Sequence, residues 1–395
     1  MLQVSKQDLE ALQAGFPPHD PELLEYLTVP NPWLELMKHY CLQQVIAPGG
    51  SKVKILYGGK ATGKTHYLQA LKVHAQREGF FVIDIDISQI SFHLTDSVAF
   101  YKAIVAKVDL NLLETVLTSK ILDKLGYSLQ DFTSFGGALV DFLCEREKSD
   151  PIQAKKDIRT CVHSIVNSLE LEFSFRKFMH MFMEAVVEKD KDSLAIARNW
   201  IQGEKIVSPH KRATMLHETL AKHNARSWLY SLIEIIKFMG YKGVVIMLDQ
   251  FEAILPKAEA VVYYTPMKRN DVYELIRQLI DDLDFFRNTL IVISGNTEIF
   301  ENEKYGLASY HALWMRIQPG FQQLQSLNIY ADLVDSNLIF SNLQQSGNLE
   351  QLKQKLLELG VQPLLADVDK GDTLGFAYQN FRELLRNKGF GAWEK

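Results

Sequence analysis

The chain has 395 residues, of which 47% are hydrophobic and 23% charged, so it can bury a sizeable core and has room for about two or three domains. Its formal net charge of −5 excludes a protein whose whole surface is a nucleic-acid footprint, although a local basic patch stays compatible with it. Three widely spaced cysteines exclude a disulfide framework and a cysteine metal site.

Membrane and export signals are not evident in the sequence. No apolar stretch approaches the ~18–20 residues of a membrane span. The first ten residues lack the charged-then-apolar order of a signal peptide. We therefore expect a cytoplasmic protein with no membrane partner.

Short helical patterns and a proline-rich break fill the first 46 residues. The break is Phe16-Pro-Pro-His-Asp-Pro, and the loop Ala47-Pro-Gly-Gly-Ser resets the chain before the first strand. This region is predicted to be an N-terminal helical segment.

A phosphate-binding loop follows the first predicted strand. An apolar run ends at Gly58, and four residues later come Gly63, Lys64 and Thr65, which gives G-x-x-x-x-G-K-T. Backbone N–H groups of such a turn, and the N-terminus of the helix that it opens, face a triphosphate. Lys64 is predicted to reach the β- and γ-phosphates and to face solvent while the site is empty, and the Thr65 hydroxyl is predicted to ligate Mg²⁺. The predicted nucleotide-binding residues of this stretch are Gly58, Gly59, Lys60, Ala61, Thr62, Gly63, Lys64, Thr65 and His66.

A second strand is predicted over residues 80–88, where isoleucines alternate with Asp84 and Asp86. These carboxylates are either water-mediated magnesium contacts or solvated strand-end residues. From about 98 to 240 the sequence is helical and contains a Met-aromatic stripe that we interpret as core. An insertion of this size exceeds what a connector needs, so it should have a role of its own.

A second acidic motif follows this insertion. The apolar residues 244–248 predict a buried parallel strand with Asp249 at its end, which is the Walker B pattern. Asp249 would hold Mg²⁺ through its water shell. The next residue is usually a glutamate that polarises the attacking water, but here it is Gln250, which cannot act as a base. Glu252 can replace it if the loop turns it inward.

A further buried strand is predicted over residues 289–294, ahead of Gly295 and Asn296. Either Asn296 or Thr297 orients the attacking water, or Gly-Asn only forms a turn. Together the three strands imply an α/β fold, a P-loop NTPase of the additional-strand (ASCE, AAA-like) type with a parallel sheet. The predicted domains are a helical segment over 1–46, a P-loop core over 47–97 and 241–320, a helical insertion over 98–240, and a small α-rich lid region over 321–395.

Several longer strings add to these motifs. They are Gly49-Gly50, Gly-Lys-Thr-His at 63–66, Ala197-Arg-Asn-Trp-Ile-Gln-Gly-Glu204, Asn224-Ala225, Met239-Gly-Tyr-Lys-Gly-Val-Val245, Gly295-Asn-Thr-Glu-Ile-Phe300 and Tyr310-His-Ala-Leu-Trp-Met-Arg316. With them the chain resembles, from about Ala47 to Ile317, the P-loop ATP-binding proteins of bacteriophage-exclusion (BREX-type) defence islands. Asp-Gln-Phe-Glu at 249–252 is instead similar to the STAND NTPases, which use nucleotide as a switch.

The resemblance implies an ATP- and Mg²⁺-dependent protein of antiviral defence, with other defence-island proteins as partners. A homo-oligomer and contact with DNA through an assembled complex stay open. Arg316 resembles an arginine that senses the γ-phosphate, and a helix salt bridge is the alternative. Lys268-Arg269 is a second candidate finger, and Arg382 and Arg386 are either lid residues or solvated helix arginines.

Two functions remain open from the sequence. The first is an active ATPase in which Glu252 activates water and an arginine completes the site. The second is a nucleotide-gated switch or scaffold with little or no hydrolysis, which Gln250 favours. A small-molecule kinase lacks an evident acceptor site.

Overall fold

The computed structural model describes residues 4–5, 7–8, 11, 16–59, 62–256, 258, 260–321, 327–346, 351 and 354–355. The chain divides into two compact units. The first combines Met1–Thr95 with Lys242–Lys395, and the second is Asp96–Tyr241.

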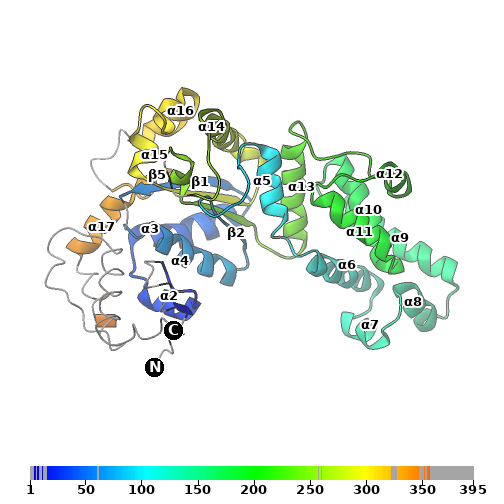
Figure 1. The fold of residues 1–395 in the computed structure, drawn as a ribbon. Coiled ribbons are helices and arrows are strands. Elements are labelled where there is room, and N and C mark those ends of the chain that lie inside the picture. Colours follow the sequence, from blue (N-terminus) through cyan, green and yellow to red (C-terminus); the bar gives the residue numbers. More distant parts are fainter. Residues whose placement is uncertain are drawn as a thin grey trace, which may run out of the picture. The chain divides into compact units, whose positions relative to one another are not determined.

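A five-stranded sheet forms the centre of the first unit, with the strand order β2-β3-β4-β1-β5 and parallel pairing throughout (Figure 1). The strands are β1 (Ser51–Gly58), β2 (Phe81–Asp86), β3 (Val244–Asp249), β4 (Thr289–Asn296) and β5 (Leu333–Asp335). This confirms the predicted α/β fold with a parallel sheet and the first four strands. β1, β3 and β4 each contain four or five apolar residues in near succession, and these strands are largely buried, as central parallel strands require.

The register brings the carboxyl ends of the strands together. Gly58 at the end of β1 lies opposite Asn296 of β4, and Tyr57 lies opposite Asp335 of β5. On the other side of the sheet, Asp86 of β2 lies opposite Asp249 of β3. The carboxyl ends of all five strands thus lie at one edge, where ligands of parallel α/β sheets bind, and four of them carry an acidic or amide residue there.

Helices cover both faces of this sheet (Figure 1). One face packs against α2, α3, a π-helix, α4 and α17 around the buried Trp33, Leu56 and Tyr67. The other face contacts α15, where the Tyr57 and Phe300 rings lie 5.0 Å apart. The helices of this unit are α2 (Pro21–Leu27), α3 (Pro32–Glu35), the π-helix Leu36–Ile46, α4 (Lys64–Arg77), α14 (Pro266–Asp281), α15 (Thr297–Glu301), α16 (His311–Phe321) and α17 (Ser336–Gln345), with 3-10 turns at Phe251–Ile254, Leu283–Phe285 and Leu307–Ser309.

A lysine lies buried within β1. Lys54 is 1% exposed, and its ammonium donates to the carbonyl oxygens of Tyr330 (2.7 Å) and Ala331 (2.6 Å). It also pairs with Asp332 at 3.3 Å. Burial lowers the pKa of Lys54. A buried ammonium is tolerated because its donors are satisfied, so Lys54 fastens the segment ahead of β5 to β1.

The second unit consists of helices in every element that the structure describes there. They are α5 (Ser97–Val105), α6 (Leu110–Leu125), α7 (Leu129–Phe135), α8 (Leu139–Glu147), α9 (Pro151–Asn167), α10 (Phe173–Glu188), α11 (Lys191–Ile201), α12 (Ser208–Thr214) and α13 (Ala225–Phe238). Its core is aromatic. Trp200 stacks on Phe178 at 5.4 Å and packs against Trp228 at 4.3 Å, and its indole N–H donates to the Glu218 carbonyl. The Met-aromatic stripe is therefore core, as predicted.

Replacing Trp200 with alanine is expected to lower the free energy of unfolding of this helical unit by about 3–5 kcal/mol, because it removes a fully buried indole and leaves a cavity. Denaturant unfolding followed by circular dichroism would measure the loss. Ile152→Ala is a matched control because Ile152 is 82% exposed, and its effect should stay within about 0.5 kcal/mol. Equal effects of the two substitutions would contradict the central place of Trp200.

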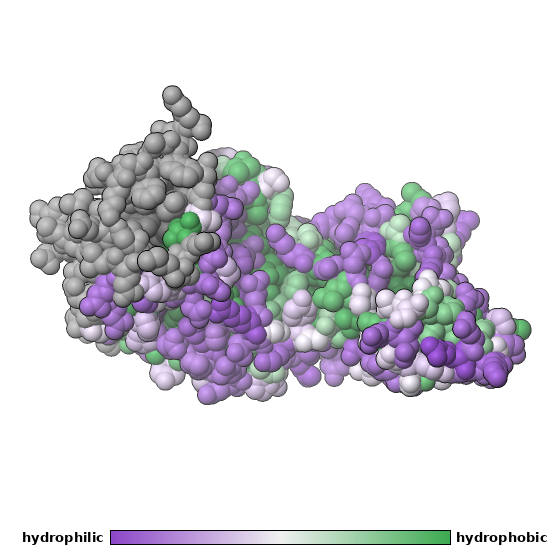
Figure 2. Space-filling view, turned by 90° about the horizontal axis from the view of Figure 1, so that it is seen from below, coloured by the Kyte–Doolittle hydropathy of each residue, from purple (hydrophilic) through white to green (hydrophobic). Residues whose placement is uncertain are grey.

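Hydrophilic residues cover most of the face in Figure 2, with smaller apolar patches between them. Among the described residues, no helix has both the length and the apolar character that crossing a membrane requires.

Candidate nucleotide-binding site

The P-loop joins β1 to α4 at the carboxyl edge of the sheet. Gly63 precedes α4 with a φ of 84°, a left-handed conformation that glycine adopts without strain. The helix then begins at Lys64, as the motif predicts. No side chain caps its first turn, so its N–H groups are available to an anion such as a phosphate. Lys60 and Ala61 lie outside the described residues.

The Lys64 ammonium lies against the loop itself. It donates to the carbonyl oxygens of Gly59 (2.6 Å) and Gly58 (3.1 Å). The expectation that this lysine faces solvent is therefore wrong, because two loop carbonyls converge on its ammonium. Burial lowers the pKa of Lys64, against the opposing effect of nearby carboxylates, Glu252 foremost. The cation is thus already held at the mouth of the loop, where a triphosphate would meet it.

Asp249 and Thr65 form the candidate magnesium ligands. Asp249 is 5% exposed, its Oδ1 accepts a hydrogen bond from the Gln250 N–H at 2.9 Å, and the Thr65 hydroxyl lies near enough to influence the pKa of its carboxylate. Burial raises the pKa of Asp249. A hydroxyl and a carboxylate side by side are the oxygen ligands that Mg²⁺ prefers. Within the described part of the chain no cluster of three or more His, Cys, Asp or Glu could hold a metal, so the cation would complete its shell with water and phosphate oxygens.

A left-handed turn at Gln250 shapes the segment after Asp249. Gln250 has a φ of 56°, and its Nε2 lies 3.4 Å from the Thr65 Oγ1. Glu252 then lies on the 3-10 turn and points inward, where its Oε2 accepts a hydrogen bond from the Asn296 N–H at 3.0 Å. Burial raises the pKa of Glu252, and the Lys64 ammonium opposes that shift. The three groups Lys64, Asp249 and Glu252 therefore influence one another electrostatically.

Asn296 has two structural partners. Its Oδ1 accepts from the Ile299 N–H at 3.1 Å and so caps α15, while its backbone N–H holds Glu252. The Asn296 side chain therefore has the local capping role, and only its backbone N–H contacts a candidate site residue, Glu252.

The candidate arginines have partners elsewhere. Arg316 on α16 pairs with Asp281 on α14, with Nη2 2.8 Å from Oδ2, which is the salt-bridge alternative. Arg269 is 6% exposed and lies 6.0 Å from the ring of Tyr305. Lys268 contacts His93 at 3.1 Å. The predicted lid residues Arg382 and Arg386 lie outside the described residues.

His66 faces the core. It is 3% exposed, and its Nε2 lies 2.8 Å from Thr28 Oγ1 at the end of α2. Thr28 donates its own proton to Leu24 O, so we assign the proton of this contact to His66 Nε2. Burial lowers the pKa of His66 to about 4. The imidazole therefore belongs to the core contact with Thr28.

The buried His66 should make stability depend on pH. The unfolded chain takes up a proton near pH 6.5 and the folded chain only near pH 4, so the free energy of unfolding should fall as the pH drops through this window. The loss attributable to His66 is about 3 kcal/mol. His66→Gln removes the titration and keeps a donor for Thr28. Denaturant unfolding at pH 7 and pH 4.5 should show a smaller loss in this variant than in the wild type, and equal losses would contradict the prediction.

Three residues at the site were missed by the sequence reasoning. Ser336 Oγ lies 2.5 Å from Thr62 Oγ1, and Asn337 Oδ1 accepts from the Gly59 N–H at 3.2 Å. Asp335, at the end of β5, accepts from the Asn337 N–H at 2.8 Å. The available signal was Asp-Ser-Asn directly after an apolar pair, which is a helix N-cap pattern.

A sequence model of the BREX system ATP-binding protein BrxC/D family matches residues 5–366. The chain belongs to this family. No curated protein matches it. Membership in the BrxC/D family indicates an ATP-binding protein with a role in an antiphage defence system, and other BREX proteins as its partners.

Two of the strings that carry the family resemblance have structural roles in this BrxC/D-family chain. Thr-Glu-Ile-Phe at 297–300 opens α15 next to the site, where Ile299 and Phe300 are buried. Trp-Ile-Gln-Gly-Glu at 200–204 organises the helical unit, because Trp200 is its aromatic centre and Glu204 pairs with Lys102 at 3.0 Å. The contacts of the second string therefore stabilise the helical unit.

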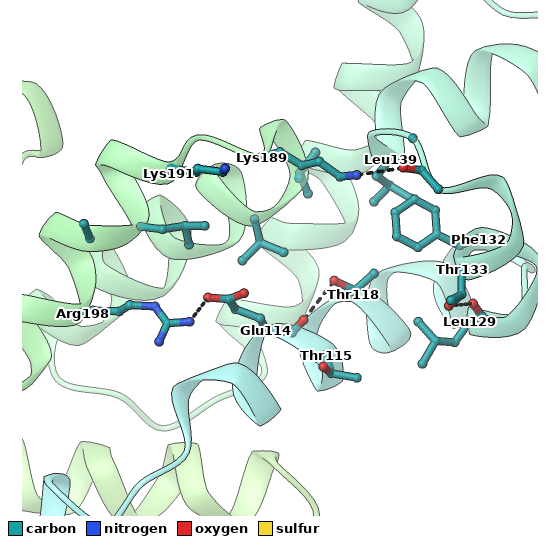
Figure 3. Close-up of a pocket in the computed structure, with 16 residues that line it drawn as sticks. Glu114, Thr115, Thr118, Leu129, Phe132, Thr133, Leu139, Lys189, Lys191 and Arg198 are labelled. Atoms are coloured by element: carbon teal, nitrogen blue, oxygen red, sulfur yellow. Dashed lines mark hydrogen bonds and ion pairs between the residues drawn. The ribbon is translucent and has the colours of Figure 1, made fainter.

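A cavity of about 830 Å³ lies within the helical unit (Figure 3). Arg198 extends into it and is held by Glu114 and by Asn111, whose Oδ1 lies 2.7 Å away. Leu129 and Phe132 of α7 contribute apolar lining. All the residues that line this cavity belong to the helical unit, and none belongs to the P-loop.

Proposed function

We propose that this chain is an Mg²⁺-dependent ATPase of the ASCE/AAA-like type that couples nucleotide turnover to conformational change and partner engagement in a BREX defence system. The observation that carries the proposal is the inward position of Glu252, held by Asn296 and next to Lys64. The strand order supports the ASCE assignment, because β4 separates β1 from β3. In this proposal residues 47–97 and 241–320 are the ATPase core, 1–46 support it, 98–240 engage partners and 321–395 act as a lid.

Each residue of the site has a defined task in this proposal. The N–H groups at the start of α4, which no side chain caps, and the Lys64 ammonium bind the phosphates. Thr65 and Asp249 hold the magnesium ion, which when bound would neutralise charge on the β- and γ-phosphate oxygens. Glu252 accepts the proton of the attacking water, and its raised pKa brings it nearer to neutral pH, where a general base works best.

A nucleotide-gated switch is the second candidate function, and Gln250 favours it. Gln250 stands where ATPases of this type place a glutamate, and its carboxamide reaches toward the Thr65 hydroxyl at 3.4 Å. ATP would then be held and not hydrolysed, and partners would recognise the ATP-bound conformation.

Phosphate release and nucleotide binding separate the two functions. The purified full chain is incubated with ATP and Mg²⁺, with and without double-stranded DNA, and bound nucleotide is identified after gel filtration. Steady release of phosphate supports the ATPase. Tight retention of unchanged ATP under every condition favours the switch, and absence of ATP binding contradicts both. The elution volume with and without ATP also tests the proposed homo-oligomer, in which Arg316 would leave Asp281 to reach a neighbouring site.

A further inference from the structure

The junction between β5 and α17, residues 335–337, packs tightly against the P-loop. A Cβ atom built on Gly58 would lie 2.2 Å from Ser336 Oγ and 3.0 Å from Asp335 Oδ1. Gly58 also has a φ of 148°, which side-chain-bearing residues rarely adopt. The first glycine of the motif is therefore needed at this position for the approach of the junction, whether or not phosphate is bound.

Hydrogen bonds join the two segments where they meet. Ser336 is fully buried and Thr62 is 1% exposed, so their 2.5 Å hydroxyl contact is shielded from water. Because Thr62 donates to Gly59 O, the proton of that contact belongs to Ser336. Asn337 adds the bond from the Gly59 N–H. The loop between Gly59 and Thr62 is thus held at both ends by consecutive residues of one helix start.

Charge connects the junction to the cation of the site. The Asp335 carboxylate, at the end of β5, lies near enough to the Lys64 ammonium for their opposite charges to attract. A triphosphate that binds the loop brings negative charge to Lys64 and so changes the environment of Asp335. The same event therefore acts on the helix that Asp335 begins.

Helix α17 is anchored in the hydrophobic core of the first unit. Ile339 and Leu343 are fully buried in the core that also holds Trp33 and Tyr67. Lys54 of β1 also holds the segment just before β5, because its ammonium donates a hydrogen bond to the Tyr330 carbonyl oxygen. Loop, junction and helix form one contiguous packed path, which is the physical requirement for coupling between them.

We propose that Asp335, Ser336 and Asn337 form a third wall of the nucleotide site: they hold the P-loop in the shape that binds a nucleoside triphosphate, and they link occupancy of the loop to α17. The inference rests on the proposed function, since it assumes that ATP enters this P-loop. By reciprocity of linked equilibria, a junction that favours ATP binding must itself be stabilised by ATP.

The test combines nucleotide titration with hydrogen exchange of the α17 amides. In the full-length wild type, ATP with Mg²⁺ should slow exchange at the start of α17. Asn337→Ala should bind ATP about tenfold more weakly, within the usual range of site coupling, and should lose this protection. Asn342→Ala is the matched control, because Asn342 is an exposed residue of the same helix.

Asn337→Asp keeps the shape and the acceptor for the Gly59 N–H, so the fold should survive, but it adds a negative charge near the phosphates. It should lower ATP affinity more than ADP affinity, an effect that a merely structural role would not produce. Wild-type ATP affinity in both Asn337 variants, or α17 exchange that ignores ATP in a wild type that binds it, would overturn the inference alone. A wild type that binds no ATP would overturn the proposed function and the inference with it.

Discussion

Replacing Lys64 with alanine is expected to abolish measurable ATP binding. The ammonium stands at the mouth of the P-loop with Gly58 and Gly59, and the substitution removes the one lysine that the motif places on the phosphates. We expect affinity to fall about 100-fold or more, equivalent to roughly 2.7 kcal/mol or more of binding free energy. Isothermal titration with ATP and Mg²⁺ would measure it.

The fold should survive this substitution with a small penalty. The ammonium loses its hydrogen bonds to two loop carbonyls and a longer one to the Thr62 hydroxyl, but the cost of partly burying the charge is lost as well. The free energy of unfolding should therefore change by no more than about 2 kcal/mol. Lys72→Ala on the same helix is the matched control, because it breaks only the 3.0 Å pair with Asp84. Wild-type ATP affinity in Lys64→Ala would refute the site, whereas loss of the cooperative melt would show that the lysine is essential to the fold.

Glu252→Gln is expected to stop turnover and leave ATP binding in place. The amide keeps the shape of the side chain and an acceptor for the Asn296 N–H, yet it cannot take a proton from water. General-base catalysis typically contributes about 10²–10⁴-fold, so phosphate release should fall by that factor. Single-turnover and steady-state assays would separate the chemical step from product release.

The control for this experiment is Glu298→Gln. Glu298 is an exposed residue of the neighbouring helix α15, so its substitution makes the same change of charge away from the buried site. If Glu252→Gln still turns over ATP, Glu252 is not the general base. Gln250 would then be the next residue to test. A gain of turnover in Gln250→Glu would then show that Gln250 holds the natural protein in an ATP-bound state.

Local patterns explain what was predictable from the sequence. The P-loop, the apolar run before Asp249 and the stripe around Phe178 are each specified by neighbours in the chain, and each appears where its pattern placed it. The helical spacing of residues 98–240 similarly predicted helices and not their packing around Trp200.

Long-range contacts explain what was missed. β5 is three residues long, too short for a periodic signal, yet it brings Ser336 against Thr62, which lies 274 residues earlier in the chain. Lys54 interrupts an apolar strand, and hydropathy gives no sign that backbone carbonyls of a distant segment will surround its ammonium. The inward turn of Lys64 depends on the backbone geometry of the loop, which composition does not encode.

The helical unit is joined to the sheet through two neighbouring strands, β2 and β3. The chain leaves the sheet just after Asp86 and returns through β3, which ends at Asp249, and these two carboxylates lie opposite each other in register. Force applied by a bound protein would therefore be transmitted through residues 87–95 to the strand ends that border the predicted metal. In the proposed ATPase, a partner bound to the helical unit would load the edge of the sheet that holds the nucleotide, and its resistance would slow each nucleotide cycle.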